Sequence, residues 1–236
     1  MNYFNSGRFD TGRHAILLLG TLLALTSCSG SPLFNADGYE RIRTVHVLDE
    51  PRHRTVHRDG DIRLLDVQIN PGDSSLPHTH DFAILYTYLN LGSEPLYGRM
   101  GGNTDYVTEP LTHTVPNNGN QLFRIIAMGN PGPAVPDSVQ DQPTGMPSVP
   151  TVENPWFRSY RLELAPGSTT AMQTHINPSV VVQVTDGIAR VTREDGITAE
   201  LAEIGHWEWR VAGSSYQIHN PGDAPVTVVV NEARRQ

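Results

Sequence analysis

Two histidines one residue apart, His78 and His80, have the side chains and the spacing of metal ligands. They lie in the stretch 71–88, PGDSSLPHTHDFAILYTY, which begins with a Pro-Gly turn and ends in an apolar, aromatic run. Successive side chains of a β-strand point to opposite faces, so residues i and i+2 share a face. The spacing therefore predicts two imidazoles side by side, as a metal ion requires.

Short runs of β-forming residues separated by turns follow one another from residue 39 onward. The 18 prolines and 21 glycines among the 236 residues favour short strands and many turns. The expected strands cover 44–48, 62–69, 83–89 and 122–128, then 157–164, 179–184, 188–192, 207–211 and 226–231. Between the two series, 129–155 is dense in Pro, Gly and polar residues, which is typical of a linker or a long surface connection.

The two series are related by an internal repeat. Residues 66–89, DVQINPGDSSLPHTHDFAILYTYL, align without gaps on residues 161–184, RLELAPGSTTAMQTHINPSVVVQV. In this alignment His80 falls on His175 and His78 falls on Gln173. Downstream, HTVPNNG at 113–119 is similar to YQIHNPG at 216–222. The chain is therefore predicted to contain two copies of one structural unit.

These motifs resemble the cupin superfamily. Gly72, His78 and His80 fit the opening G-x5-H-x-H of the first cupin motif, and His113 and Asn117 fit the H-x3-N that ends the second. The chain is thus similar to a two-domain cupin, or bicupin. The resemblance implies an all-β fold of two tandem double-stranded β-helix (jelly-roll) barrels with antiparallel strands. The expected domains are an N-terminal barrel at 39–128, a linker at 129–155 and a degenerate C-terminal barrel at 156–236.

The resemblance also implies a metal site in the first barrel, with His78, His80 and His113 as ligands. Where cupins usually place a glutamate ligand, this chain has Ile84 or Leu85. Three neutral imidazoles suit a divalent transition metal; we expect Fe(II), with zinc, manganese, nickel and copper as alternatives. The competing interpretation is a barrel that has lost its metal and keeps the histidines as hydrogen-bonded interior residues.

The second copy has a weaker set of residues at the ligand positions. Gln173, His175 and Tyr216 stand where the first copy has its three histidines. One imidazole, an amide and a phenol make a poor divalent-metal site. This copy is expected to serve packing, dimerisation or a modified pocket, so a homodimer is one of the expected partners.

Two tyrosines and an arginine are the candidates for catalysis. Tyr86 and Tyr88 have the parity of His80 if the strand continues through Asp81, and their hydroxyls could then orient a substrate. Arg124 lies on a first-barrel strand and could clamp a carboxylate if it is buried, as could Arg63 or Arg99; the alternative for each is an exposed surface position. His53 and His57, in the arginine-rich segment EPRHRTVHRDG, are expected on a solvated turn.

Two classes of function follow from these residues. The first is a metal-dependent enzyme, with an Fe(II) dioxygenase-type reaction on a small polar organic molecule as the leading expectation; the resemblance also includes isomerases and other cupin enzymes. The second is a non-catalytic module that binds a small molecule or a metal. Because this fold hosts many chemistries, the resemblance does not choose between them.

The N-terminus is expected to be a targeting signal. Arg8 and Arg13 precede an apolar run at 15–25, which is too short to span a bilayer but fits a secretory signal. The run ends in Leu-Thr-Ser-Cys28, which resembles the lipobox of bacterial lipoproteins. This predicts a signal peptide at 1–27, lipidation of Cys28, a tether at 28–38 and a cell-envelope location, with the periplasmic face of the outer membrane favoured. An ordinary signal peptide with a coincidental cysteine is the alternative.

Composition and charge exclude several other functions. The net charge of −8 argues against nucleic-acid binding, which needs clustered cations. All 17 basic residues are arginine, so a lysine Schiff base and a P-loop are excluded. The single cysteine excludes an internal disulfide. A small-molecule ligand, and a membrane reached through the lipid anchor alone, remain the expected partners.

Overall fold

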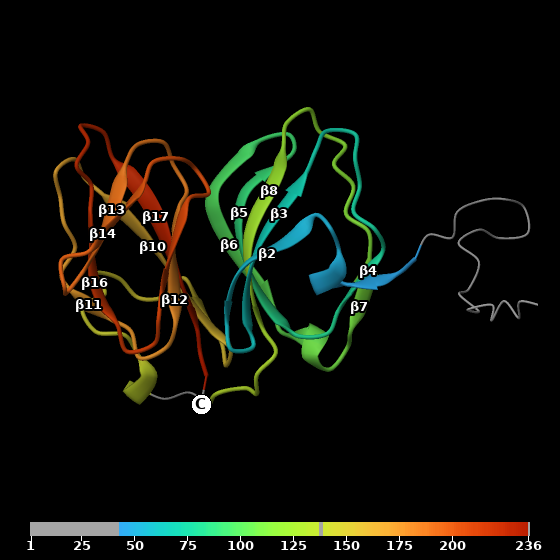
Figure 1. Cartoon of the computed structure of the whole chain (residues 1–236), viewed down its shortest axis with the longest axis horizontal. Coiled ribbons are helices and arrows are strands. Elements are labelled where there is room, and N and C mark those ends of the chain that lie inside the picture. Colours follow the sequence, from blue (N-terminus) through green and yellow to red (C-terminus); the bar gives the residue numbers. More distant parts are fainter. Residues whose placement is uncertain (1–42, 137–138, 236) are drawn as a thin grey trace, which may run out of the picture. The chain divides into compact units, whose positions relative to one another are not determined.

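A computed structural model describes residues 43–136 and 139–235. The expected signal peptide, the tether and Cys28 lie outside these residues. Within the described ranges, no helix is both long enough and apolar enough to cross a bilayer. The described chain is almost entirely β-structure, joined by turns and three short 3-10 helices (Figure 1).

The first barrel is built from two sheets. The larger sheet has the strand order β2-β3-β8-β5-β6 and the smaller one has the order β1-β4-β7. The strands of the larger sheet are β2 (His53–Asp59), β3 (Ile62–Ile69), β5 (Ala83–Leu91), β6 (Pro95–Asn103) and β8 (Phe123–Asn130). Those of the smaller sheet are β1 (Val45–His46), β4 (His78–His80) and β7 (Leu111–His113), and two 3-10 helices, η1 (Val47–Asp49) and η2 (Asp105–Val107), flank them.

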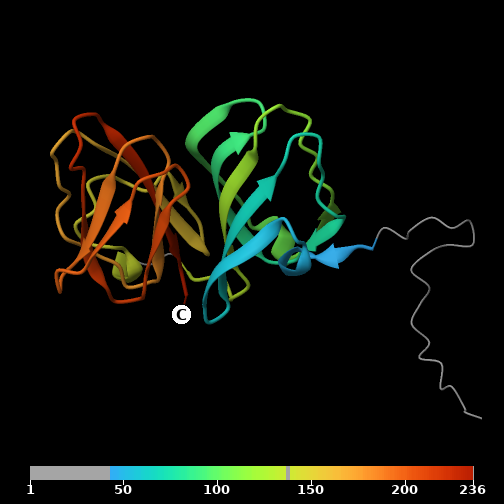
Figure 2. The ribbon, with the colours of Figure 1, turned by 45° about the horizontal axis from the view of Figure 1, so that its top comes forward.

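The second barrel repeats this plan. Its larger sheet has the order β15-β12-β17-β10-β9 and its smaller sheet has the order β11-β16-β13-β14. The larger sheet contains β9 (Val152–Glu153), β10 (Phe157–Leu164), β12 (Ser179–Gln183), β15 (Trp207–Arg210) and β17 (Val226–Ala233). The smaller sheet contains β11 (Gln173–Thr174), β13 (Ala189–Arg193), β14 (Thr198–Leu201) and β16 (Ser215–His219), drawn in yellow to red in Figure 2.

Equivalent residues of the two copies make the same contacts. His78 pairs with His113 between β4 and β7, and Gln173 pairs with Tyr216 between β11 and β16. The amide of Asn117 donates to the carbonyls of Ile69 and Gln121. The amide of Asn220 donates in the same way to the carbonyls of Leu164 and Ala224. The structure thus confirms the predicted fold class, with two jelly-roll barrels in tandem.

Two details of the expected fold are corrected. The pairing of β1 with β4 is parallel, whereas an entirely antiparallel fold was expected. Residues 53–59, expected as a solvated turn, form strand β2 and pair with β3 along its length. The high density of arginine in this segment indicated exposure, but His53 is only 5% exposed.

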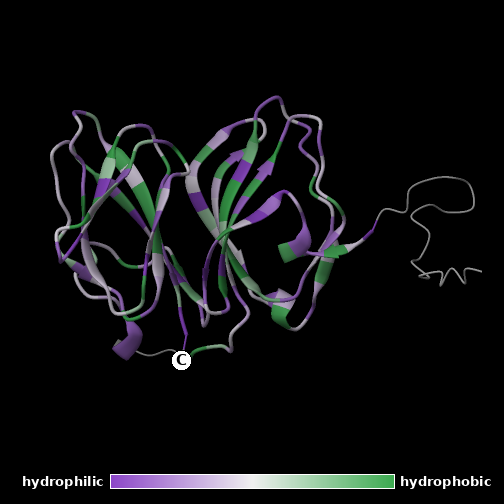
Figure 3. Ribbon diagram, in the orientation of Figure 1, coloured by the Kyte–Doolittle hydropathy of each residue, from purple (hydrophilic) through white to green (hydrophobic). Residues whose placement is uncertain are grey.

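The central strands β3, β5 and β8 of the larger sheet in the first barrel are largely buried on both faces. Ile84, Ile125 and Ala127 belong to the core inside the barrel. Alternate residues such as Leu85 and Ile126 belong to a core shared with second-barrel residues that include Val180. Burial on both faces agrees with the many apolar residues in these strands, parts of which are green in Figure 3.

A buried polar cluster supports the second barrel. The carboxylate of Glu232, fully buried, accepts hydrogen bonds from Arg158, His175 and Asn177. Asp141, on η3 (Val139–Asp141), accepts from Arg158 at 2.8 Å. Part of the segment between the two series is therefore anchored on the second barrel by ionic contacts.

The ionic contacts of Asp141 predict a dependence of stability on pH. Burial alone would raise its pKa, but hydrogen bonds from Arg158 and Arg234 lower the pKa to about 2, from 3.8. A carboxyl group with a depressed pKa in the folded state stabilises the fold above its ordinary pKa, and this contribution disappears as the pH falls from about 4 through about 2. A shift of this size corresponds to about 2 kcal/mol.

Asp141→Asn is therefore expected to lower the free energy of unfolding by about 2 kcal/mol at pH 7. The difference from the parent protein should narrow between pH 4 and pH 2. Urea unfolding at a series of pH values measures both quantities. A difference that stays constant over this range would contradict the prediction.

Candidate metal centre

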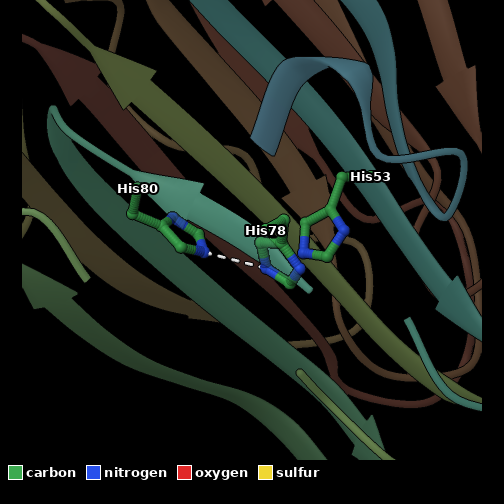
Figure 4. Close-up of side chains that lie close together, drawn as sticks. All are labelled: His53, His78 and His80. Carbon is green, nitrogen blue, oxygen red and sulfur yellow. Dashed lines mark hydrogen bonds between the residues drawn. The ribbon is translucent and has the colours of Figure 1, made fainter. Parts of the chain in front are cut away.

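The two histidines of β4 point their Nε2 atoms toward each other. His78 is fully buried and His80 is 1% exposed. The two Nε2 atoms lie 3.1 Å apart, joined by the dashed line in Figure 4. Although β4 has only three residues, its pairing with β1 and β7 fixes the backbone that carries both rings.

His113 joins these two residues from the neighbouring strand β7. It lies directly opposite His78 in the antiparallel pair, and its Nε2 atom is 3.1 Å from Nε2 of His80. The structure therefore brings together all three histidines that the sequence predicted as ligands. His80 is the central residue, because its Nε2 atom is close to both of the others.

A fourth histidine, which sequence reasoning placed on the surface, belongs to the same cluster. One ligand atom each from His53, His78 and His80 lies within 4.8 Å of the others, and all three residues are buried. Figure 4 shows the ring of His53 beside that of His78. The ring centroids of His53 and His78 are 4.4 Å apart. The sequence signal for His53 was a glutamate, Glu50, three residues before it. The arginines around His53 indicated an exposed segment instead.

Glu50 orients the ring of His53 through its Nδ1 atom. Its fully buried carboxylate lies 2.7 Å from Nδ1 of His53. Burial alone would raise the pKa of Glu50, but hydrogen bonds from His53 and from the backbone N–H groups of Leu76 and Arg52 lower it below its usual value. Glu50 is therefore a carboxylate that accepts the Nδ1 proton, which leaves the lone pair of His53 on Nε2. This carboxylate–imidazole arrangement is the one that commonly supports a metal ligand.

The electrostatics of the cluster favour neutral imidazoles. Burial, together with the neighbouring histidines, lowers the pKa of His80 to about 3. Burial also lowers the pKa of His113. It lowers the pKa of His53 as well, although the hydrogen bond that His53 donates to Glu50 acts in the opposite direction. The Nδ1–H group of His78 donates to the carbonyl of Leu76 at 2.8 Å, so its lone pair lies on Nε2. Metal ligation requires this neutral form.

The spacing of the nitrogens fits a shared ion. Metal–imidazole bonds of about 2.0–2.1 Å separate two ligand nitrogens by about 2.9 Å at a right angle and by about 3.4 Å at a tetrahedral angle. The Nε2 separations of 3.1 Å fall in this range. Buried lone pairs facing one another at this distance repel unless a proton or a cation lies between them. The donor set therefore fits a divalent transition metal.

A cavity of about 230 Å³ opens onto the cluster. His53, His80 and His113 lie on its wall with Tyr86 and Tyr88. The rest of the wall is apolar or aromatic: Val67, Ile84, Tyr106, Val115, Phe123, Ile125 and Ala127. Alternate residues from β4 to β5, including His80, Tyr86 and Tyr88, therefore face the same cavity, despite the bend at 81–82. The cavity offers a small ligand an apolar wall with phenolic hydroxyl groups beside the imidazoles.

Burial keeps the tyrosines protonated. The pKa of Tyr86 is raised, first by burial and then by Tyr106 and Tyr88. Burial also raises the pKa of Tyr88. Both phenols can therefore donate a hydrogen bond to a ligand at neutral pH. Tyr106, whose ring centroid is 5.1 Å from that of His80, was not among the predicted site residues, because it lies on η2 outside every recognised motif.

The structure places Arg124 away from this cavity. Its neighbour Ile125 lines the cavity, so Arg124 faces the opposite side of the sheet. There its guanidinium pairs with Asp66 at 3.1 Å and donates to the carbonyl of Ile204. Its position indicates a structural contact with the second barrel. Arg63 likewise donates to the backbone carbonyls of Gly60 and Ile62.

The corresponding position in the second barrel is closed. His175 and Tyr216 are fully buried, and the Tyr216 hydroxyl lies 3.2 Å from Nε2 of His175. The Nδ1 atom of His175 lies 2.7 Å from the carboxylate of Glu232. Both ring nitrogens thus have partners within the protein, which agrees with a role in packing.

Glu50→Gln should weaken metal binding without removing a ligand. The amide is a poorer acceptor for the Nδ1 proton of His53, so the basicity and the orientation of that ring are reduced. We expect the dissociation constant for metal to rise about 10- to 100-fold. Competition with a chromogenic chelator measures it, and Glu203→Gln, whose side chain is 78% exposed, is the control. Equal affinities of parent and Glu50→Gln would exclude this supporting role.

Comparisons with solved structures agree with the fold. The structure of AerE from Microcystis aeruginosa matches 79% of this chain and 99% of that chain, with a TM-score of 0.51 and 10% sequence identity. At this identity the similarity shows the fold alone. No family model and no curated protein matches the sequence.

Several structural neighbours are cupin proteins that match a part of the chain. A cupin domain from Bordetella pertussis Tohama I is 24% identical over 37% of this chain and 91% of its own, with a TM-score of 0.33. A sugar phosphate isomerase of the cupin superfamily from Silicibacter pomeroyi DSS-3 is 24% identical over 34% of this chain and 52% of its own, with a TM-score of 0.29.

Proposed function

We propose that the first barrel is a cupin-type metal site that binds one divalent transition metal and a small organic molecule. Nε2 of His80 lies close to Nε2 of both His78 and His113, and His80 and His113 line a cavity that also contains tyrosines; this convergence carries the proposal. His53, supported by Glu50, is a fourth nitrogen donor within reach. The second barrel provides packing and contributes no ligand.

An ion bound there would supply Lewis acidity and, for iron, redox chemistry. The chain's own residues supply the rest. The imidazoles, in their neutral form, would hold the ion. The apolar wall, which includes Val67 and Phe123, excludes water from the cavity. The protonated hydroxyls of Tyr86 and Tyr88 orient a polar group of the ligand. These contributions are positioning and electrostatic preorganisation.

Within this proposal, an Fe(II) dioxygenase-type enzyme is the leading function. Neutral histidines contribute no negative charge to the ion, unlike the 2-His-1-carboxylate set of better-known iron oxygenases. An anionic ligand group would balance the charge. The alternative is a non-catalytic module that holds a small molecule or a metal, and zinc, which is served well by histidines, would favour it.

Metal analysis followed by reconstitution separates these two functions. We expect about one metal per chain in protein purified from its native host. Apoprotein reconstituted anaerobically with Fe(II) should then consume oxygen in the presence of a substrate from panels of thiols, diketones and phenolic acids. Native protein that carries zinc and shows no substrate-dependent uptake would favour the binding module instead.

We also propose that the protein is anchored at the cell envelope through lipidated Cys28, on the N-terminal pattern alone. Stable anchoring needs more than one acyl chain, as lipoproteins have. The protein expressed in its host should partition into the detergent phase, and Cys28→Ala should move it to the aqueous phase. A Cys28→Ala protein that partitions like the parent would refute the anchor.

A further inference from the structure

A second, outer cavity adjoins the one that contains the histidines. Its volume is about 460 Å³. Tyr86, Tyr88 and Tyr106 line both cavities, so these three side chains form the boundary between the two. The far side of the outer cavity is formed largely by β6, including Arg99, Gly101 and Asn103. A ligand that reaches the histidines from this side therefore passes β6.

Strand pairing puts Arg99 on the cavity face of the sheet. In the antiparallel pair β5–β6, Tyr88 lies opposite Arg99 and Tyr86 lies opposite Gly101. Residues directly opposite each other in such a pair project from the same face. Gly101 lies directly beside Tyr88, because a Cβ atom there would be 3.4 Å from the ring of Tyr88. Arg99 and Tyr88 therefore line the outer cavity from neighbouring strands.

Arg99 is free to bind a ligand. Among the described residues, it has no hydrogen-bond or ion-pair partner, whereas Arg63 and Arg124 are both engaged. It is also the only charged side chain among the described residues that line the outer cavity. Its positive charge acts on Tyr88, where it opposes the effect of burial on the pKa of that phenol. A lone cation beside an apolar, aromatic cavity selects for an anionic group.

We propose that the ligand of the histidine site is a small carboxylic acid whose carboxylate is bound by Arg99 while its other end faces the histidines. This inference rests on the proposed function and specifies its substrate class. The planar guanidinium can bind a carboxylate through two parallel hydrogen bonds. The apolar wall, with Phe123 and Ile125, accommodates a hydrocarbon or aromatic body between the two ends. The inner cavity is too small for a large ligand.

Matched probes that differ only in charge test this inference. The zinc-loaded full chain is titrated calorimetrically with 3-phenylpropionate and with its neutral amide, 3-phenylpropanamide. We expect the acid to bind at least about 10-fold more tightly than the amide, which corresponds to about 1.4 kcal/mol. Arg99→Gln should abolish this preference, and Arg99→Lys should retain part of it, because lysine keeps the charge but not the planar geometry.

Arg58→Gln is the control variant. Arg58 is exposed and, like Arg99, has no hydrogen-bond or ion-pair partner among the described residues, but it lines neither cavity. Its replacement removes the same charge and should leave the preference intact. The inference is overturned if the zinc-loaded parent does not bind the acid, if it binds acid and amide equally, or if Arg99→Gln keeps the preference.

Measuring the zinc content before each titration separates this inference from the proposed function. A chain that holds zinc but shows no carboxylate preference overturns the assignment to Arg99 and leaves the metal site standing. A chain that takes up no metal overturns the proposed function. If such a chain still prefers the acid, and Arg99→Gln loses the preference, the carboxylate site stands by itself.

Discussion

Replacing His80 with glutamine is expected to reduce metal content from about one ion per chain to less than about 0.1. The Nε2 atom of His80 lies 3.1 Å from Nε2 of both His78 and His113, so its loss removes both of these close contacts. His80 also belongs to the set of three buried histidines, with His53 and His78, whose ligand atoms lie within 4.8 Å of one another. Elemental analysis after equilibration with Fe(II), Mn(II) or Zn(II) measures the loss.

Thermal unfolding provides a second measurement on the same variant. A ligand that binds only the folded state at 100 times its dissociation constant stabilises that state by about 2.7 kcal/mol. The parent should show this gain on addition of metal, and His80→Gln should not. His206→Gln, whose side chain is 42% exposed in the second barrel, is the control and should behave like the parent.

The outcome also decides which barrel holds the ion. A His80→Gln protein with the parent's stoichiometry and affinity would show that the ion binds elsewhere. The His175 position is the first alternative to examine, because it is the equivalent residue of the second copy. His175→Gln is expected to change metal content little, since both of its ring nitrogens are engaged within the protein.

Glu232→Gln is expected to lower the free energy of unfolding by about 3–5 kcal/mol. The carboxylate of Glu232 is fully buried and accepts hydrogen bonds from Arg158, His175 and Asn177. Glutamine has the same shape, but its NH2 group faces at least one of these donors and it removes a charge that compensates Arg158. A buried donor left without an acceptor carries the full cost of its desolvation.

Urea unfolding measures this effect, and the exposed Glu203→Gln is its control, expected within about 0.5 kcal/mol of the parent. Metal content per folded chain should be unchanged in Glu232→Gln, because the residue lies in the second barrel. A loss of less than about 1 kcal/mol would mean that the cluster relaxes around the amide. A loss of metal together with stability would instead couple the two barrels.

Much of the fold could be predicted from the sequence because it depends on local patterns. The runs of β-forming residues at 62–69 and 83–89 predicted strands that the structure contains, and a Pro-Gly turn follows the first of them. The internal repeat was visible because equivalent turns need equivalent residues. Asn117 and Asn220 are such a pair, since each amide bonds the same two backbone carbonyls of its own barrel.

The candidate site was predicted in part for the same reason. His78 and His80 share a strand face, so their proximity follows from spacing alone. The parity of Tyr86 and Tyr88 placed them correctly on the cavity wall. Arg124 was misplaced as a site residue, because the sequence shows that it lies on a strand but not which face of that strand is lined by the cavity.

The sequence alone predicted part of the set of strands, the repeat and the histidine pair, all of which depend on neighbours along the chain, but it missed strands such as β2 and β6. The tertiary structure decided which distant residues join that pair. A β-bulge between Thr55 and His57 puts His53 opposite Val67 and His57 opposite Leu64. His53 therefore faces the cavity, while the ring of His57 lies 4.5 Å from that of Trp209 on the other face. A single extra residue in a strand reverses the face of every residue beyond it, and only the paired strand shows where it lies.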